Sequence, residues 1–191
     1  ILFGPDGSRK TTLLMTIMGF AADGVLQGRI TFKGVDITGA PMYERARLGV
    51  GMSFQRPPTI HGLSTRNMVR MCGLHSPAAG NGAEPDVEEL ARKVNFDRFL
   101  DRDVNAGFSG GGIKSSELLQ LMAQQPDLLL FDEPESGVDL ENMALIGETA
   151  RQLLSGAPFG KEREHCPKKT MLRGGKSGLI ITHTGYILDY V

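Results

Sequence analysis

Residues 128–134 read Leu-Leu-Leu-Phe-Asp-Glu-Pro and set the fold class of this 191-residue chain. Four apolar residues followed by two acids are typical of a buried parallel strand that carries carboxylates to its C-terminal edge. Further apolar runs at 1–3, 48–54 and 179–182 are expected to be buried strands and alternate with helical patterns. This alternation predicts an α/β fold with a mainly parallel sheet.

Helical and hairpin patterns surround these strands. Apolar residues within 13–18 mark one face of a helix that ends near Gly19, and those within 118–122 mark a second helix packed on the sheet. Residues 29–37 alternate around Lys33-Gly34, which predicts a small antiparallel β element.

Residues 60–105 are expected to form an inserted helical subdomain. The segment Ser64 to Cys72 favours a helix, and a Pro- and Gly-rich loop follows at 76–85. Asp86 and Glu89 then have capping-box spacing and open a helix that is expected to continue toward Phe99.

Composition restricts the class of protein. With 21 basic and 22 acidic residues, a net charge of −1 offers no general attraction to nucleic acid or to an anionic membrane. The cysteines, Cys72 and Cys166, lack CxxC spacing, which favours a reducing compartment, and no apolar run reaches the roughly 18 residues of a spanning helix. We expect a cytoplasmic protein without direct membrane insertion. An apolar strand pattern stands at each end of the sequence, so we interpret residues 1–191 as part of a single, larger domain.

Residues 4–11, Gly-Pro-Asp-Gly-Ser-Arg-Lys-Thr, stand between a strand and a helix and follow the pattern GxxxxGK[ST] at all but one position. In this context the loop wraps a triphosphate with backbone N–H groups, Lys10 reaches the β and γ phosphates, and the Thr11 hydroxyl ligates Mg²⁺. The expected nucleotide contacts here are Gly4, Pro5, Asp6, Gly7, Ser8, Arg9, Lys10, Thr11 and Thr12.

Arg9 is the exception, because it occupies the position of a motif glycine. Strain at a sparsely populated backbone conformation costs about 1–3 kcal/mol. A site that binds nucleotide with micromolar affinity has a binding free energy of about 8 kcal/mol. Strain alone therefore weakens nucleotide binding without abolishing it. Two outcomes stay open: a direct clash that closes the site, or a guanidinium that compensates as a phosphate ligand.

The two acids at the end of the strand are candidates for hydrolysis. Asp132 is expected to support a Mg²⁺ ion, and Glu133 to act as the general base that orients the attacking water. The alternative interpretation is a solvated turn.

Several short motifs resemble those of ABC ATPases, and they occur in the order of that family. The match covers the P-loop, Gln55 at a strand end, Phe108-Ser109-Gly110-Gly111, Asp132-Glu133, Ser136-Gly137-Val138-Asp139 and His183. The resemblance implies that Gln55 meets Mg²⁺ and the lytic water and that His183 contacts the γ-phosphate. It also implies that Ser109, Gly110, Gly111 and Asp139 act on ATP bound by the other copy of a nucleotide-dependent head-to-tail homodimer.

The signature region is similar to that of SufC, the ATPase of SUF iron–sulfur cluster assembly. The similarity rests on residues 108–111, on Ser116-Glu117-Leu118-Leu119-Gln120, and on residues 132–139 and 52–58. It implies SufB/SufD-like scaffold proteins as partners. Gly112 and Ser115, like Arg9, depart from the pattern of these relatives.

Two other functions stay open on the sequence alone. The chain has the motifs of the nucleotide-binding subunit of an ABC importer, in which residues 56–105 would dock a membrane protein. Arg9 instead favours a non-hydrolysing binding module. The basic stretch at 156–178 is interpreted as a mobile loop or a partner surface.

Overall fold

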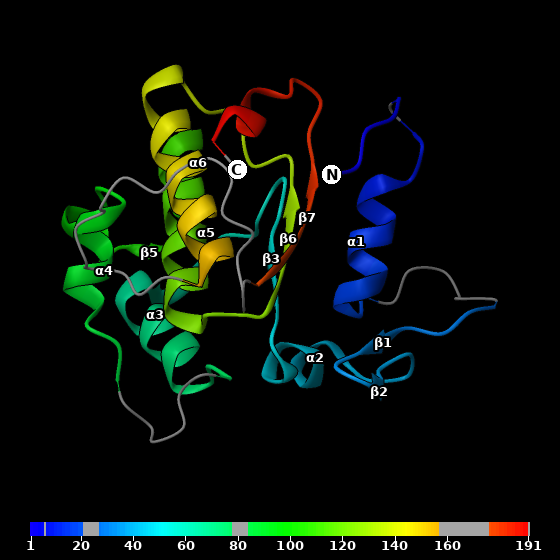
Figure 1. Cartoon of the computed structure of the whole chain (residues 1–191). Coiled ribbons are helices and arrows are strands. Elements are labelled where there is room, and N and C mark those ends of the chain that lie inside the picture. Colours follow the sequence, from blue (N-terminus) through cyan, green and yellow to red (C-terminus); the bar gives the residue numbers. More distant parts are fainter. Residues whose placement is uncertain (6, 21–26, 78–83, 157–175, 191) are drawn as a thin grey trace.

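A three-stranded parallel sheet forms the centre of the computed structural model. The structure describes residues 1–5, 7–20, 27–77, 84–156 and 176–190. The strand order is β3 (Val50–Ser53), β6 (Leu128–Asp132), β7 (Ser177–Ile181). The register pairs Val50 with Leu128 and Leu128 with Ser177, so the three strands end at one edge. The prediction of a parallel α/β core is confirmed (Figure 1).

Helices cover both faces of this sheet, and β6 is therefore buried on both sides. Leu129 and Phe131 pack in the cluster that includes α5 (Gly110–Gln124) and α6 (Leu140–Ser155), whereas Leu130 packs in the cluster of α1 (Lys10–Met18). Alternate side chains of a strand point to opposite faces, which explains this division. Burying each such side chain contributes about 1.5–3 kcal/mol. Figure 1 shows α1 on one side of the sheet and α5 with α6 on the other.

The predicted hairpin is present beside α1. Strands β1 (Thr31–Phe32) and β2 (Val35–Asp36) pair antiparallel. Lys33 and Gly34 both have positive φ, 49° and 78°, as a two-residue type I′ turn requires.

The helix that follows, α2 (Met42–Leu48), was not predicted, and it carries a buried arginine. The Arg45 guanidinium donates to the carbonyls of Thr16 and Ile17 at 2.8 and 2.9 Å, and to those of Thr38 and Ala40 at 2.9 Å. It thereby satisfies carbonyls of the last turn of α1 and joins α1 to the segment between the hairpin and α2.

Residues 60–104 form a group of short elements packed against α5. They are β4 (Ile60–Ser64), α3 (Thr65–Leu74), α4 (Val87–Lys93), η1 (Asp97–Phe99) and β5 (Asp103–Val104). Side chains of Ser64 and Asp86 cap α3 and α4, the latter by accepting from Glu89 N at 2.8 Å, as the capping-box spacing predicts. The antiparallel β4–β5 pair was not predicted.

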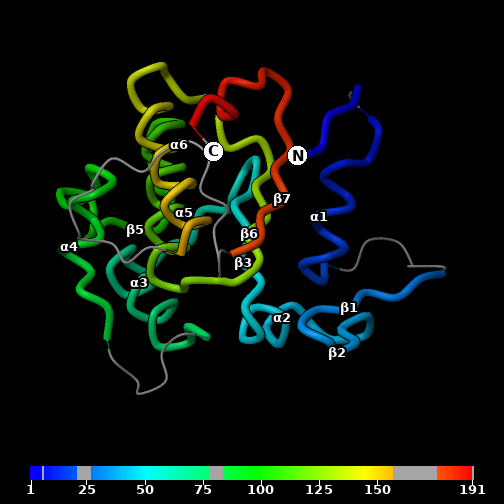
Figure 2. Tube along the Cα trace, viewed as in Figure 1, coloured from blue at the N-terminus to red at the C-terminus, as the bar shows by residue number. Residues whose placement is uncertain are grey.

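Some expected boundaries were wrong. Residues 1–3 form no full strand: Leu2 makes one isolated bridge to Ile181, and Ile1 and Phe3 are each 61% exposed because they lie at the sheet edge, uncovered by the described part of the chain. Figure 2 shows this N-terminal segment beside β7. The run at 48–54 is also shorter as a strand, because Leu48 still belongs to α2.

At the other boundaries, α4 ends at Lys93 because Val94 and Asn95 leave the helical conformation, so Phe99 lies in the separate turn η1. Helix α6 and the turn η2 (Tyr186–Asp189) were not predicted. Of the basic stretch 156–178, residues 157–175 lie outside the described residues, and β7 already begins at Ser177. Among the helices that the structure describes, none combines the length and apolarity needed to cross a bilayer.

Candidate functional site

The phosphate loop leads directly into α1 and curls around its lysine. Ser8 N donates to Pro5 O at 3.2 Å, which closes the loop. Lys10 Nζ donates to Gly4 O at 2.7 Å, to Pro5 O at 3.0 Å and to Ser8 Oγ at 3.3 Å. The ammonium therefore lies at the loop, beside the N-terminus of α1, where helix amides and dipole favour an anion. Asp6 lies outside the described residues.

Arg9 adopts the backbone conformation that the motif reserves for glycine. Its φ of 61° and ψ of 29° are left-handed, at the N-cap of α1, and Gly7 in the same loop has a φ of 80°. The left-handed conformation costs an L-residue about 1–2 kcal/mol. The helix nevertheless begins normally, because Leu13 N donates to Arg9 O at 3.1 Å, and the Arg9 side chain is exposed. Thr12, also exposed, lies in the first turn of α1.

Thr11 and Asp132 join α1 to the end of β6. Thr11 Oγ1 donates to Asp132 Oδ1 at 3.1 Å, and Asp132 is only 1% exposed. Burial raises the pKa of Asp132, against the opposing effect of the Thr11 hydrogen bond. Its Oδ2 atom is buried with no hydrogen-bond partner among the described residues. An unpaired carboxylate oxygen beside a threonine hydroxyl is a donor set that suits Mg²⁺, so the residues present fit this ion.

Glu133 forms the centre of a hydrogen-bonded group at the same sheet edge. Gln55 Nε2 donates to Glu133 Oε2 at 2.7 Å, and His183 Nε2 lies 2.7 Å from Glu133 Oε1. Gln55 follows β3, Glu133 follows β6 and His183 follows β7. The structure thus brings together the three side chains predicted to be catalytic. Glu133 has a φ of 47°, a strained conformation of the kind found at functional sites.

The Ser-Gly-Gly turn at residues 109–111, called the signature turn or Ser109 turn below, opens α5, as expected. Ser109 Oγ accepts from Gly112 N at 3.3 Å and caps the helix. A Cβ atom at Gly110 would lie 2.0 Å from Gly137 O, so only glycine allows the turn to touch the segment 136–139. No hydrogen bond within the described ranges joins this turn to the phosphate loop of the same chain.

Asp139 caps the next helix. Its Oδ1 atom accepts from Asn142 N at 2.9 Å at the start of α6, and this hydrogen bond holds the pKa of Asp139 below its usual range. A Cβ at Gly111 would lie 3.0 Å from Asn142 Nδ2, so the signature turn also lies against the start of α6.

An aromatic group anchors the residue before the turn. The Phe108 ring lies 5.2 Å from that of Phe96 and 5.7 Å from that of Phe99, both edge-on, and the Arg102 guanidinium lies 4.6 Å from its centroid. Phe96 is fully buried and Phe99 belongs to η1. The signature turn is thereby attached to the 60–104 elements.

Sequence reasoning missed a buried ion pair that supports Gln55. Lys114 Nζ lies 3.2 Å from Glu117 Oε2, and both side chains are at most 5% exposed. Glu117 Oε1 accepts from Phe54 N at 2.8 Å, and Lys114 donates to Phe54 O. Burial raises the pKa of Glu117. The pair therefore fixes the backbone just before Gln55, and its only sequence signal was two opposite charges at i,i+3 in an apolar helix.

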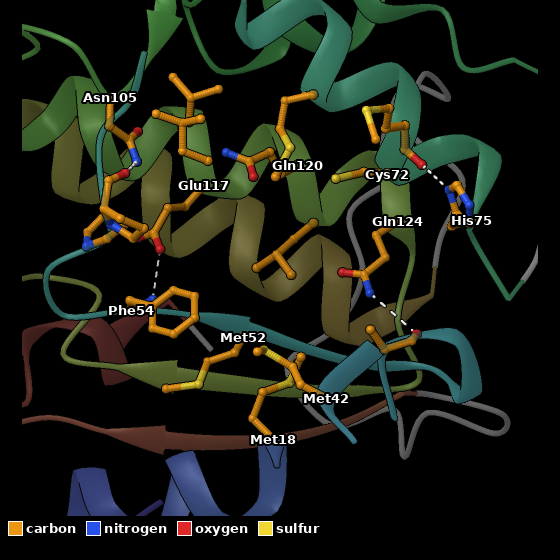
Figure 3. Close-up of a pocket in the computed structure, with 18 residues that line it drawn as sticks. Met18, Met42, Met52, Phe54, Cys72, His75, Asn105, Glu117, Gln120 and Gln124 are labelled. Atoms are coloured by element: carbon orange, nitrogen blue, oxygen red, sulfur yellow. Dashed lines mark hydrogen bonds between the residues drawn. The ribbon is translucent and has the colours of Figure 1, made fainter. Parts of the chain in front are cut away.

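A cavity of about 380 Å³ lies next to this pair. Figure 3 shows the thioethers of Met18, Met42 and Met52 on its sheet side, with Cys72 on α3 and His75 directly after that helix. Its remaining lining includes Pro57, Pro58, Ile60, Met68 and Met71. Methionine side chains adapt to irregular partners, so the cavity offers a deformable apolar surface one residue from Gln55.

Known proteins are similar to this chain in sequence. The family model described as "ABC transporter" matches residues 1–136. "Uncharacterized ABC transporter ATP-binding protein MJ0035" of Methanocaldococcus jannaschii is 38% identical over 143 residues, 73% of this chain and 57% of that protein. "Probable ATP-dependent transporter ycf16" of Cyanidium caldarium is 32% identical, and "Probable ATP-dependent transporter SufC" of Escherichia coli 30%; both matches cover all of this chain, and 71% and 73% of those proteins.

Solved structures agree on the fold. A nucleotide-free ATP-binding cassette from an ABC transporter has a TM-score of 0.68 at 23% identity, covering 98% of this chain and 72% of that one. The dimeric cassette MJ0796 bound to ADP and Pi has a TM-score of 0.70 at 20% identity, covering 98% and 75%. With the phosphate loop, the strand-end carboxylates and the signature turn in place, the chain belongs to the ABC transporter ATP-binding family and has its α/β P-loop fold.

Proposed function

We propose that the protein hydrolyses ATP. The observation that carries this proposal is the convergence of Gln55, Glu133 and His183 at one edge of the sheet, beside the Thr11–Asp132 pair. In this arrangement two polar side chains hold the carboxylate of Glu133, the proposed base. The Lys10 ammonium already lies within the phosphate loop, where it can meet the phosphates.

In the proposed mechanism, loop amides and Lys10 bind the β and γ phosphates. Asp132 and Thr11, with Gln55, would hold Mg²⁺, which when bound neutralises charge on the phosphate oxygens. Glu133 orients the attacking water and accepts its proton. Gln55 and His183 keep the Glu133 carboxylate in place, since each is 2.7 Å from one of its oxygens.

We further propose a head-to-tail homodimer. The Ser109 turn presents the first amides of α5, a favourable site for phosphate oxygens, and no hydrogen bond in the described part ties it to its own phosphate loop. In the proposed dimer the turn contacts the γ-phosphate bound by the second copy, and Gly110, Gly111 and Asp139 lie at the same interface. ATP then acts as the bridge between copies, which makes dimerisation nucleotide-dependent.

The partners are proposed to be SufB/SufD-like scaffold proteins of iron–sulfur cluster assembly. Similarity to the Escherichia coli SufC protein along the whole chain supports this assignment. The cavity beside Phe54 supports it as well, because a partner seated there would lie one residue from Gln55. ATP binding would in this way be coupled to remodelling of the scaffold.

The test of hydrolysis compares the wild type with Glu133→Gln in a phosphate-release assay. Turnover should fall by about 10²-fold or more, because the general base is lost, whereas Mg-ATP binding measured by calorimetry should persist. Glu148→Gln, an exposed change on α6, is the matched control and should leave turnover unchanged. Turnover that survives Glu133→Gln would contradict the mechanism, and failure to copurify with any SufB/SufD-like protein would contradict the assigned partner.

A second candidate function is the nucleotide-binding subunit of an ABC importer. The cavity favours it too, because Pro57, Pro58 and Ile60 belong to the segment that would dock a membrane permease. Recovery of the protein with a permease after detergent extraction, and without a scaffold, would establish this alternative. A non-hydrolysing binding module is excluded by any turnover that Glu133→Gln removes.

A further inference from the structure

Glu135 has no part in the mechanism above, yet its carboxylate is buried near the sheet edge that carries Glu133. The residue is 6% exposed, and its Oε1 atom accepts hydrogen bonds from the hydroxyls of Thr182 and, at 3.3 Å, Thr184. Its Oε2 atom is buried without a hydrogen-bond partner among the described residues. An apolar side chain would fill this space without the cost of desolvating a carboxylate, so packing alone does not account for an acid here.

The two threonines stand on either side of His183. Thr182 Oγ1 also accepts from Gly185 N at 2.9 Å, and Thr184 Oγ1 from Tyr186 N at 3.4 Å. One carboxylate oxygen therefore holds the whole turn that follows β7. The backbone on both sides of His183 is fixed, while its ring lies 2.7 Å from Glu133.

Glu135 and Glu133 also belong to one hydrogen-bonded segment. Ser136 N donates to Glu133 O at 3.0 Å, and Val138 N donates to Glu135 O at 3.3 Å, so two turns follow β6 without a break. The base and the buried acid thus lie in consecutive turns, and both contact the turn that carries His183.

We propose that Glu135 is a positioning residue that holds His183 against Glu133 by accepting hydrogen bonds from Thr182 and Thr184. No hydrogen bond in the described part of the chain joins it to the phosphate loop or to Lys10. The inference rests on the proposed ATP hydrolysis, which it deepens by naming a residue that sets the geometry of the base.

The first test is steady-state ATP hydrolysis by Glu135→Ala. The kcat should fall about tenfold, a fraction of the roughly 10²- to 10⁴-fold that a positioned acid or base supplies, while KM for Mg-ATP stays within about twofold. Glu135→Gln keeps an acceptor oxygen for both hydroxyls and should recover most of the rate. Glu148→Ala, exposed on α6, is the matched control.

A double-mutant cycle separates positioning from general stability. If Glu135 acts through His183, then Glu135→Ala should cause no further loss of kcat in the His183→Ala background. An equal loss in both backgrounds, or an unchanged kcat in the single variant, would overturn the proposal. Should Glu135→Ala not fold, Thr184→Ala replaces it, with Thr184→Ser expected to behave as the wild type; identical rates for these two would also overturn it.

NMR of ¹³C-labelled histidine gives a readout that needs no turnover. The His183 resonance, assigned by its absence from His183→Ala, should move toward the position of a solvent-exposed ring in Glu135→Ala and stay in place in Glu148→Ala. If the wild type hydrolyses no ATP but this shift occurs, the proposed function fails while the positioning role holds. If ATP is hydrolysed and the resonance does not move, the positioning role fails alone.

Discussion

Replacing Arg9 by glycine tests how the phosphate loop accommodates its exceptional residue. The left-handed backbone of Arg9 costs about 1–2 kcal/mol, and glycine removes that cost while adding about 0.5–1 kcal/mol of backbone entropy to the unfolded chain. Arg9→Gly should therefore raise the free energy of unfolding by about 1 kcal/mol or less. For a chain of this size such a change raises Tm by about 2–4 °C at most.

The effect on ATP affinity should be small. The strain belongs to the loop conformation that already positions Lys10, so binding does not have to supply it, and the exposed Arg9 side chain lies outside the hydrogen bonds that close the loop. We expect Kd for Mg-ATP to agree within about tenfold between the two proteins, because one charge-assisted contact to a phosphate is worth about 1.5 kcal/mol.

Isothermal titration calorimetry measures the affinities, and Arg9→Ala is the matched variant that keeps the β-carbon but removes the guanidinium. An affinity lost equally in Arg9→Ala and Arg9→Gly identifies a phosphate contact by the guanidinium. Binding by Arg9→Gly alone would refute the reasoning, since the side chain would then block the site and the chain would be a non-hydrolysing module.

The remaining predictions concern packing and burial. Gly110→Ala should lower the free energy of unfolding by about 1–3 kcal/mol in urea denaturation, because its Cβ would meet Gly137 O at 2.0 Å, whereas Gly39→Ala meets no atom within 4 Å and should be tolerated. Arg45→Ala should cost about 2–3 kcal/mol in the same assay because carbonyls at the end of α1 lose their donor; a cost near zero would show that water replaces the guanidinium. Burial raises the pKa of the Cys72 thiol to about 11 from 9.0. In a variant with no other cysteine, iodoacetamide should therefore alkylate Cys72 about 100-fold more slowly at pH 8 than it alkylates a free thiol, and the rate should still increase above pH 9. Alkylation as fast in the native protein as in urea would contradict the raised pKa.

The sequence predicted the elements whose patterns are fixed by local rules. Residues 128–131 carry no polar side chain because β6 is covered on both faces, so their strand could be read directly. Lys33-Gly34 predicted its hairpin because the turn needs two residues at positive φ. The joint placement of Gln55, Glu133 and His183 was also predictable, because carboxyl ends of parallel strands share one edge.

Other parts depend on contacts that one segment does not encode. Lys114 and Glu117 have the pattern of a solvated helix face, and only packing of α5 against the end of β3 buries them. Glu135 similarly reads as an ordinary acid in a turn, and its burial needs the threonines that follow β7. The apolar residues Ile1 and Phe3 misled in the opposite sense, since hydrophobic character predicts burial only where another element covers the strand.

Phe108 links the 60–104 elements to the Ser109 turn. Its ring is clamped between Phe96, Phe99 and Arg102, and the peptide that follows it is the Ser109 turn. A tilt of the 60–104 elements would therefore move the amides of the Ser109 turn, and in the proposed homodimer it would change their distance from the second copy. Under the proposed function, a partner bound to the 60–104 elements would then control the rate of hydrolysis, although this region contains none of the proposed catalytic residues Gln55, Glu133 and His183.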